Sequence, residues 1–241
     1  MSTSPRERII VALDTDAAGA RELARALAGS VRWLKVGMTL FYQAGPAIVT
    51  ELREQGFDVF LDLKLHDIPH QVRGAAESVS RLGVQMLTVH ASGGAPMVAA
   101  AVEGAAEGAA VAGLPSPAVI GVTVLTSMSD DVLHSVGINR VAAEQVPLLG
   151  GVVRDAGAAG CVCSPQEAHL MRELLGPDAL VVTPGVRPAG ADVGDQSRVA
   201  TPAAAIASGA SHLVIGRPIT EASDPREAVE RIVSEMEGPN A

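Results

Sequence analysis

Residues 59–81 of the 241-residue chain read VFLDLKLHDIPHQVRGAAESVSR, and this stretch contains the unit from which we expect the fold to be built. The apolar run Val59–Leu63 predicts a buried strand. The stretch Gln71–Arg81 predicts an amphipathic helix, which follows a turn that ends at Ile68 and Pro69. A buried strand followed by a helix, repeated along a chain, indicates a parallel sheet with helical crossovers.

The same unit recurs from one end of the sequence to the other. The predicted strands are Ile9–Leu13, Trp33–Val36, Val59–Leu63, Met86–His90, Ala118–Val124, Gly160–Cys163, Leu180–Thr183 and His212–Ile215. The predicted helices between them include Ala17–Ala28, Phe41–Gln55, Gln71–Arg81, Ala95–Ala112, Pro165–Leu175 and Pro202–Ser208, with Asp224–Met236 last.

Eight strand–helix units in a chain of this length predict an α/β fold, a closed (β/α)8 TIM barrel, because such barrels use about 250 residues. A doubly wound open sheet is the competing topology, but no dinucleotide-binding glycine fingerprint follows the first strand. Because no break in composition or long charged run divides the chain, we expect residues 1–241 to form a single domain.

The composition of the chain excludes two classes of binding partner. Since the net charge is -9 and no basic stripe is present, we expect neither nucleic acid nor an anionic membrane as a partner. The segment Met1–Arg8 is polar, and no stretch approaches the roughly 20 apolar residues of a membrane span. Cys161 and Cys163 occupy adjacent same-face positions of one strand, which suit a disulfide poorly, so we expect reduced thiols and a cytoplasmic protein.

Ionisable residues gather where the predicted strands end, which is where barrel enzymes keep their chemistry. Asp62 and Lys64 are two residues apart at the end of the third strand, so both side chains should point into the barrel mouth. An isolated Asp-x-Lys could be a plain ion pair. Asp14 and Lys35, however, end the two preceding strands and face the same mouth, which favours a catalytic centre.

These motifs closely resemble those of the orotidine 5′-phosphate decarboxylase family. The matching segments are Val-Ala-Leu-Asp14, Leu-Lys35-Val-Gly, Leu-Asp62-Leu-Lys64-Leu-His-Asp67-Ile-Pro, Val-Thr123-Val-Leu-Thr126-Ser, Thr183-Pro-Gly-Val-Arg187-Pro, Gly194-Asp-Gln196 and Val-Ile-Gly216-Arg217-Pro-Ile. Sugar-phosphate lyases of the same barrel superfamily share Asp-x-Lys-x-x-Asp, but the full set in this order is more specific. The resemblance implies a cofactor-free, metal-free lyase that converts orotidine 5′-phosphate into UMP and carbon dioxide, the last step of de novo pyrimidine biosynthesis.

The resemblance also implies roles for the residues at the strand ends. Lys64 would place its ammonium group beside the nascent C6 carbanion and then donate the proton. Neighbouring carboxylates favour that charged form of the lysine. Asp62 would lie against the substrate carboxylate, and Asp14 and Lys35 would hold the ribose hydroxyls and complete an Asp-Lys-Asp-Lys array.

A homodimer with shared active sites is implied as well, in which Asp67 and Ile68 reach into the partner's site and contact the ribose. The family commonly has Asn-Thr after this motif, and its Thr also contacts the substrate across the interface. This chain has His70 and Gln71 instead, and Gln71 can hydrogen-bond but has a different reach. His66 and His70 are spaced i,i+4 and could suggest zinc, but no third ligand is implied.

The remaining expected substrate-binding residues are Thr126, Pro184, Arg187, Gln196, Gly216 and Arg217. Gly216 and Arg217 follow the last strand, and backbone N–H groups with one guanidinium suit a phosphate dianion. Thr126 matches a position that hydrogen-bonds the pyrimidine. Thr183–Ala200 is a long loop with glycines and prolines, and it is typical of a lid that brings Arg187 and Gln196 over the substrate. His90, at the end of the fourth strand, could line the site or be a buried histidine bonded to backbone.

Two other functions compete with this interpretation. A magnesium-dependent sugar-phosphate lyase would need a carboxylate near the end of the second strand, where this chain has Lys35. A catalytically dead nucleotide-binding barrel would have no reason to keep both lysines and all three carboxylates.

Overall fold

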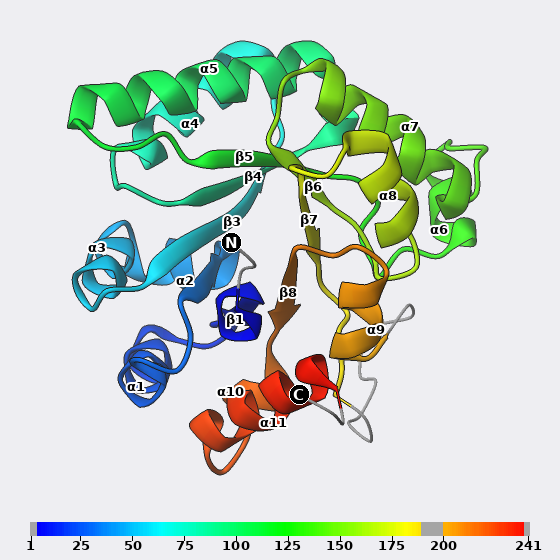
Figure 1. Cartoon of the computed structure of the whole chain (residues 1–241). Coiled ribbons are helices and arrows are strands. Elements are labelled where there is room, and N and C mark those ends of the chain that lie inside the picture. The colour runs from blue at the N-terminus through cyan, green and yellow to red at the C-terminus, as the bar shows by residue number, and fades with distance from the viewer. Residues whose placement is uncertain (1–3, 189–199, 239–241) are drawn as a thin grey trace.

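The computed structural model describes residues 4–188 and 200–238, and its eight parallel strands close into a barrel in chain order (Figure 1). The strands are β1 (Ile9–Ala12), β2 (Trp33–Gly37), β3 (Asp58–Leu65), β4 (Met86–His90), β5 (Ala118–Val122), β6 (Gly160–Val162), β7 (Leu180–Thr183) and β8 (His212–Ile215). β1 pairs with β8 and so completes the ring. The predicted TIM barrel is therefore confirmed.

Helices surround this barrel (Figure 1). They are α1 (Ala17–Leu27), α2 (Met38–Ala44), α3 (Ala47–Glu54), α4 (Pro69–Ser80), α5 (Ala95–Ala112), α6 (Asp130–Ser135), α7 (Ala142–Asp155), α8 (Ala168–Leu175), α9 (Pro202–Ala207), α10 (Arg217–Thr220) and α11 (Pro225–Glu237), with short 3-10 turns at Pro5–Arg8 and Ala91–Gly93. None of the helices in the described part of the chain is long and apolar enough to cross a membrane.

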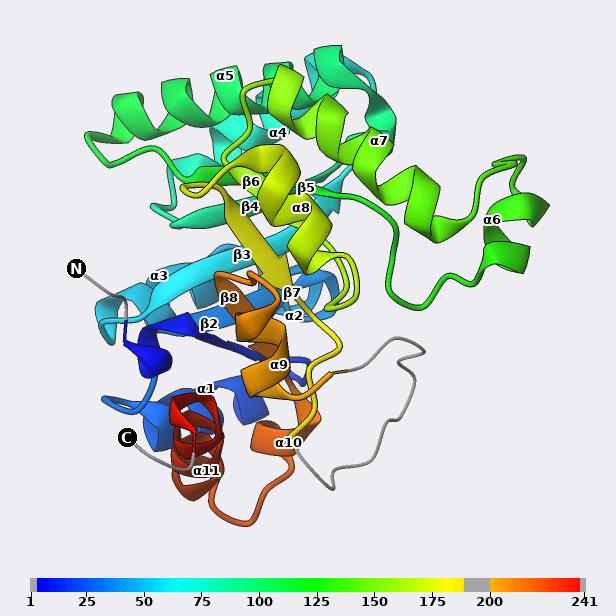
Figure 2. The same ribbon diagram turned by 45° about the vertical axis from the view of Figure 1, so that its right-hand side comes forward.

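Two helix predictions were wrong or incomplete. The single helix expected over Phe41–Gln55 is divided into α2 and α3, because Gly45 turns the chain at a φ of 68° and Pro46 follows it. The helices α6 and α7 were not predicted. α7 contains Pro147 within its length, which weakens the sequence signal for a helix, and α6 lies at the edge of the molecule (Figure 2).

The inside of the barrel is filled by an apolar layer. Its buried members are Ile10, Ala12, Phe60, Met86, Ile120, Val182 and Val214, contributed by β1, β3, β4, β5, β7 and β8. Asp14 follows Ala12 by two residues and Asp62 follows Phe60 by two, so strand alternation places both carboxylates on the mouth side of this layer. The charged residues therefore stand on an apolar floor.

β3 contains an irregularity close to its end. Leu61 pairs with Leu87 and Leu65 pairs with Val89, so four steps along β3 correspond to two along β4. Within this stretch Lys64 has a φ of 51°, the only positive φ of a non-glycine residue in the described ranges. Such a conformation is uncommon outside glycine and costs free energy, and strained residues of this kind cluster at functional sites.

The helices α4 and α5 pack very closely. A Cβ at Gly104 would overlap the backbone carbonyl of Arg73, and a Cβ at Gly108 would overlap that of Glu77. The absence of side chains at these two glycines lets the backbones of the helices approach each other. Asp67 and Ile68 directly precede α4, so their backbone leads into this closely packed pair of helices.

Candidate active site

A cavity of about 590 Å³ opens at the carboxyl ends of the strands. Its floor consists of Ala12, Phe60, Val122, Val162 and Val214. Nine of the expected site residues line it: Asp14, Lys35, Asp62, Lys64, Thr126, Pro184, Arg187, Gly216 and Arg217. The structure thus brings together most of the residues that the sequence singled out.

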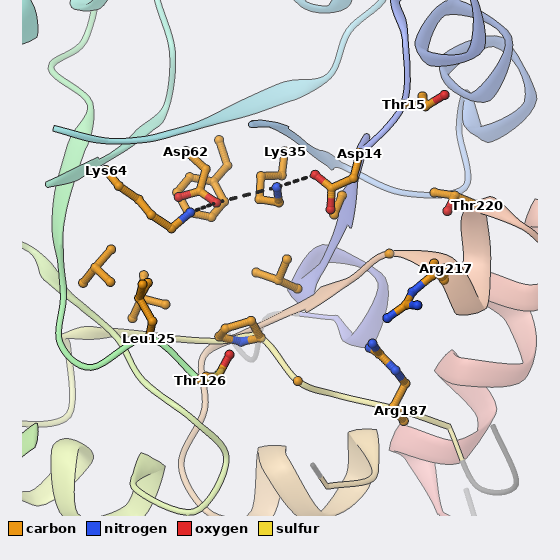
Figure 3. Close-up of a pocket in the computed structure, with 18 of the residues that line it drawn as sticks. Asp14, Thr15, Lys35, Asp62, Lys64, Leu125, Thr126, Arg187, Arg217 and Thr220 are labelled. Carbon is orange, nitrogen blue, oxygen red and sulfur yellow. Dashed lines mark hydrogen bonds and ion pairs between the residues drawn. The ribbon is translucent and has the colours of Figure 1, made fainter. Parts of the chain in front are cut away.

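Four of these residues form a continuous charged row along one wall (Figure 3). Lys35 Nζ lies 2.9 Å from Asp14 Oδ1 and 3.6 Å from Asp62 Oδ2. Lys64 Nζ lies 2.8 Å from the same Asp62 Oδ2. The signs alternate along the row, so each lysine is adjacent to a carboxylate.

Burial changes along this row. The side chains of Lys35 and Asp62 are only 9% and 11% exposed, while that of Lys64 is 27% exposed and that of Asp14 is 66% exposed. Burial by itself raises the pKa of Asp62, but Lys35 and Lys64, with hydrogen bonds from Lys64 and Thr88, outweigh it and hold that pKa below its ordinary value. Asp62 is therefore an anion at neutral pH, and Lys64 keeps a face open to the cavity.

Two arginines mark the other end of the cavity. Arg187 and Arg217 direct their guanidinium groups toward the same region, from the ends of β7 and β8 (Figure 3). Arg187 is held at its backbone, because its N–H donates to the carbonyl of Ala200 and Val186 forms a bridge with Ala200. Two cations converging on one region suit an anionic group of the ligand.

Three expected site residues do not line this cavity. Asp67 and Ile68 are exposed on the surface just before α4, and Ile68 is 61% exposed. Asp67 Oδ1 accepts a hydrogen bond from the N–H of Ile68 at 2.6 Å, which shapes this turn. Gln196, with most of the expected lid, lies outside the described residues.

A second, smaller pocket of about 260 Å³ lies on another side of the charged row. It is lined by Asp14, Lys35, Asp62 and Lys64, and by residues that include Met38, Thr39 and Leu40 at the beginning of α2. The charged row is therefore accessible from two sides, one facing the main cavity and one beside α2.

Comparison with known proteins settles the family. Residues 7–232 match the family model described as Orotidine 5'-phosphate decarboxylase / HUMPS family. The chain belongs to this family. Among curated relatives, the orotidine 5'-phosphate decarboxylase of Synechococcus sp. (strain WH7803) is 50% identical over 241 residues and 98% of each chain, and that of Moorella thermoacetica is 50% identical over 96% of this chain and 93% of its own. Among solved structures, the orotidine 5'-phosphate decarboxylase from Lactobacillus acidophilus matches with a TM-score of 0.84 and 40% identity over 96% of this chain and 100% of its own.

One polar residue in the wall of this decarboxylase-family barrel escaped the sequence analysis. Thr88 of β4 is fully buried, donates a hydrogen bond to Asp62 Oδ1 at 3.0 Å and accepts one from the Lys64 N–H at 2.9 Å. A signal was present in the sequence, because strand alternation puts Thr88 on the same inward face as Met86 and His90. It was missed because threonine is also an ordinary strand residue.

His90 lies near the charged row rather than in the lining of the main cavity. Its ring centroid is 5.4 Å from that of His66. Burial, and next the neighbouring His66 and Lys64, lower the pKa of His90, so this imidazole is neutral at pH 7. No group of three or more His, Cys, Asp or Glu side chains arranged to hold a metal ion occurs among the described residues.

Proposed function

We propose that the protein decarboxylates orotidine 5′-phosphate to UMP and carbon dioxide, with Lys64 as the cation at C6 and the proton donor. The observation that carries this proposal is the unbroken row Asp14–Lys35–Asp62–Lys64 along one wall of a cavity whose far end holds Arg187 and Arg217. Family membership supports the same reaction. Residues 1–241 would act as a single barrel domain.

The reaction explains why a charged row is needed. Breaking the bond between C6 and the carboxylate releases carbon dioxide and leaves the electron pair on C6, in the plane of the ring. No adjacent carbonyl can delocalise this pair, so the site must stabilise it electrostatically. Lys64 Nζ then gives a proton to C6, which yields UMP and leaves a neutral amine that solvent reprotonates.

Asp62 serves two purposes in this proposal. It holds the Lys64 ammonium group at 2.8 Å, and as a buried anion it faces the substrate carboxylate, whose charge disappears when carbon dioxide leaves. A charge contact at about 4 Å with an effective dielectric near 20 amounts to about 4 kcal/mol. Enzymes lower barriers by roughly 8–23 kcal/mol, so a single such contact is not sufficient.

The remaining stabilisation has to come from binding the rest of the substrate. We assign the phosphate to Arg187, Gly216 and Arg217, the pyrimidine edge to Thr126 beside Pro184, and the ribose hydroxyls to Asp14 and Lys35. These groups lie around one cavity, with the arginines at one end and the Lys64 ammonium at the other. Closure of Gln196 over the pyrimidine remains a prediction from the family resemblance.

The experiment that tests the reaction is an ultraviolet assay with orotidine 5′-phosphate in the presence and absence of EDTA. We expect equal rates of UMP formation under both conditions. Loss of activity with EDTA and its return with magnesium would instead favour a metal-dependent lyase. Binding of UMP without any turnover of orotidine 5′-phosphate would favour a binding protein.

We further propose a homodimer in which Asp67 and Ile68 of one copy enter the smaller pocket beside the charged row of the other. Both residues are exposed and lie outside the main cavity. Ile68, Met38 and Tyr42 expose 61%, 45% and 74% of their surface, and they follow the neighbouring strands β2 and β3. Exposed large apolar groups beside an incomplete site favour a self-associating surface.

Mixing two inactive variants tests this dimer. Asp67→Ala and Lys64→Ala are each expected to be nearly inactive alone. After unfolding and refolding together, they should recover roughly a quarter of wild-type activity, because random pairing gives half heterodimers, each with one intact site. If each site is made by one chain alone, mixing restores nothing.

A further inference from the structure

We propose that Thr88 is a positioning residue for the decarboxylation, because its hydroxyl group fixes both the Asp62 carboxylate and the backbone from which Lys64 projects. This inference rests on the proposed catalytic role of Asp62 and Lys64. It adds a residue that does not line the cavity and would act through Asp62 and Lys64.

The hydroxyl of Thr88 is both a hydrogen-bond donor and a hydrogen-bond acceptor. Its hydrogen goes to Asp62 Oδ1 at 3.0 Å, and its oxygen accepts the Lys64 N–H at 2.9 Å. The other carboxylate oxygen, Asp62 Oδ2, accepts from Lys64 Nζ at 2.8 Å. Each oxygen of Asp62 therefore has a fixed donor, and the carboxylate cannot rotate about its last torsion without losing one of them.

The same hydroxyl also provides a hydrogen-bond acceptor in the irregular part of β3. Between the paired residues Leu61 and Leu65, β3 has two more residues than β4, so the regular ladder cannot provide an acceptor for every N–H. The Lys64 N–H receives one from the Thr88 side chain instead of from a backbone carbonyl. Lys64 has a positive φ of 51°, and a strained backbone of this kind persists only where its surroundings stabilise it. The hydrogen bond to Thr88 provides such stabilisation.

Loss of the hydroxyl has a specific consequence. Thr88 is completely buried, so water cannot replace it without a change in packing. Asp62 Oδ1 and the Lys64 N–H would both lose a partner, and the Lys64 ammonium would no longer be held at one position. The substrate-binding groups at the other end of the cavity, Arg187 and Arg217, would be unaffected.

The test compares three substitutions at this position. Thr88→Val keeps the shape and removes the hydroxyl, Thr88→Ser keeps the hydroxyl, and Thr88→Ala removes both the hydroxyl and the methyl group. We expect Thr88→Val to lower kcat about 10- to 100-fold, the equivalent of one hydrogen bond to a charged group, while KM changes less than about threefold. Thr88→Ser should retain most of kcat.

The pH profile gives a second readout that a merely structural role would not move. Asp62 is surrounded by Lys35, Lys64, His90 and, beyond Lys35, Asp14. Since the Thr88 donor helps to keep Asp62 ionised, its loss should shift the acidic limb of kcat/KM to higher pH in Thr88→Val and not in Thr88→Ser.

Thr123→Val is the matched control. Thr123 is a buried threonine beyond the end of β5, does not line the cavity, and donates its hydroxyl to the carbonyl of Val162 at 2.8 Å. Its loss should reduce the melting temperature without changing the pH profile.

Three outcomes decide the proposal. A kcat in Thr88→Val within twofold of wild type, or an equal loss in Thr88→Ser, would overturn it. If Thr88→Val does not fold, the Ser and Ala variants carry the comparison, and equal kcat values in those two would also overturn it. Lys64→Ala serves as a reference: if that variant remains active, the proposed function itself fails, whereas an inactive Lys64→Ala with a normal Thr88→Val rejects only the role of Thr88.

Discussion

At the scale of a single residue, Arg217 illustrates the proposed separation between the part of the cavity that binds the phosphate and the part in which the reaction occurs. It lies at the end of β8, away from Lys64, with Arg187 beside it (Figure 3). Since both arginines lie apart from Lys64 (Figure 3), we propose that they contribute to the reaction through the phosphate of the substrate, which is remote from C6. Binding energy from such a group can still accelerate the reaction when it is used to hold the reacting part in place.

We expect Arg217→Ala to reduce kcat/KM about 10- to 150-fold, as is typical of a lost charged hydrogen bond of about 1.5–3 kcal/mol. Steady-state kinetics with orotidine 5′-phosphate measure this effect. Arg140→Ala provides the control, because Arg140 is exposed and does not line the cavity. An unchanged kcat/KM in Arg217→Ala would remove Arg217 from the phosphate site.

The sequence predicted the residues of the charged row but not what fixes them. Asp14, Lys35, Asp62 and Lys64 follow from one rule, the convergence of parallel strand ends at one mouth. The contribution of Thr88 depends on a two-residue irregularity in β3 and on the left-handed backbone of Lys64. A pattern of strand alternation contains no information on such a local departure from regular pairing.

The close packing of α4 against α5 is the most informative feature at the scale of elements. We expect Gly108→Ala to destabilise the fold by about 1–3 kcal/mol, because the new methyl group would overlap the backbone of Glu77. Urea denaturation measures this change. Since Asp67 and Ile68 directly precede α4, the variant should also weaken the proposed dimer.

Gly151→Ala provides the matched control for this prediction. Gly151 lies inside α7, and a Cβ at this position would meet nothing within 4 Å. Alanine should therefore stabilise this helix by about 0.5–1 kcal/mol. Equal effects of the two substitutions would show that helix propensity, and not contact between α4 and α5, determines the outcome.

The strands could be predicted from the sequence more accurately than the helices. The eight strands were found because each is a short buried apolar run, and periodicity detects these well. The helix over Phe41–Gln55 was wrong since its amphipathic pattern continues across Gly45 and Pro46, which divide it. The helices α6 and α7 were missed where proline, glycine and polar residues interrupt the pattern.

At the scale of the whole molecule, the end of the barrel opposite the active site also contains an ionisable group. His212, at the start of β8, lies edge-on to Trp33 with ring centroids 5.5 Å apart. Burial, and next the charges of Arg8 and Arg32, lower the pKa of His212 to about 4 from its ordinary 6.5. The folded protein therefore holds this imidazole in its neutral form.

This pKa difference predicts a loss of stability in acid. As the pH falls below 6.5, His212 becomes protonated in the unfolded chain, whereas in the folded chain it stays neutral until about pH 4. The free energy of unfolding is therefore unaffected by this group above pH 6.5. It decreases as the pH falls from 6.5 to 4, by about 3 kcal/mol in total.

Urea denaturation of His212→Phe between pH 7 and pH 4 measures this contribution, because phenylalanine keeps the aromatic contact and cannot titrate. The stability of this variant should fall less steeply than that of wild type over the interval. His134→Phe, at an exposed position on α6, should follow the wild-type slope. Parallel slopes for all three proteins would mean that His212 is not the group responsible.

The most direct test of the central claim is a comparison of turnover and ligand binding in Lys64→Ala. If Lys64 is both the cation at C6 and the proton donor, turnover of orotidine 5′-phosphate should fall by at least about 10⁴-fold, because two contributions are removed together. Binding of UMP, measured by calorimetry on the same folded sample, should stay within about tenfold of wild type, since Arg187, Arg217 and Thr126 remain. A kcat within tenfold of wild type would contradict the assignment of Lys64.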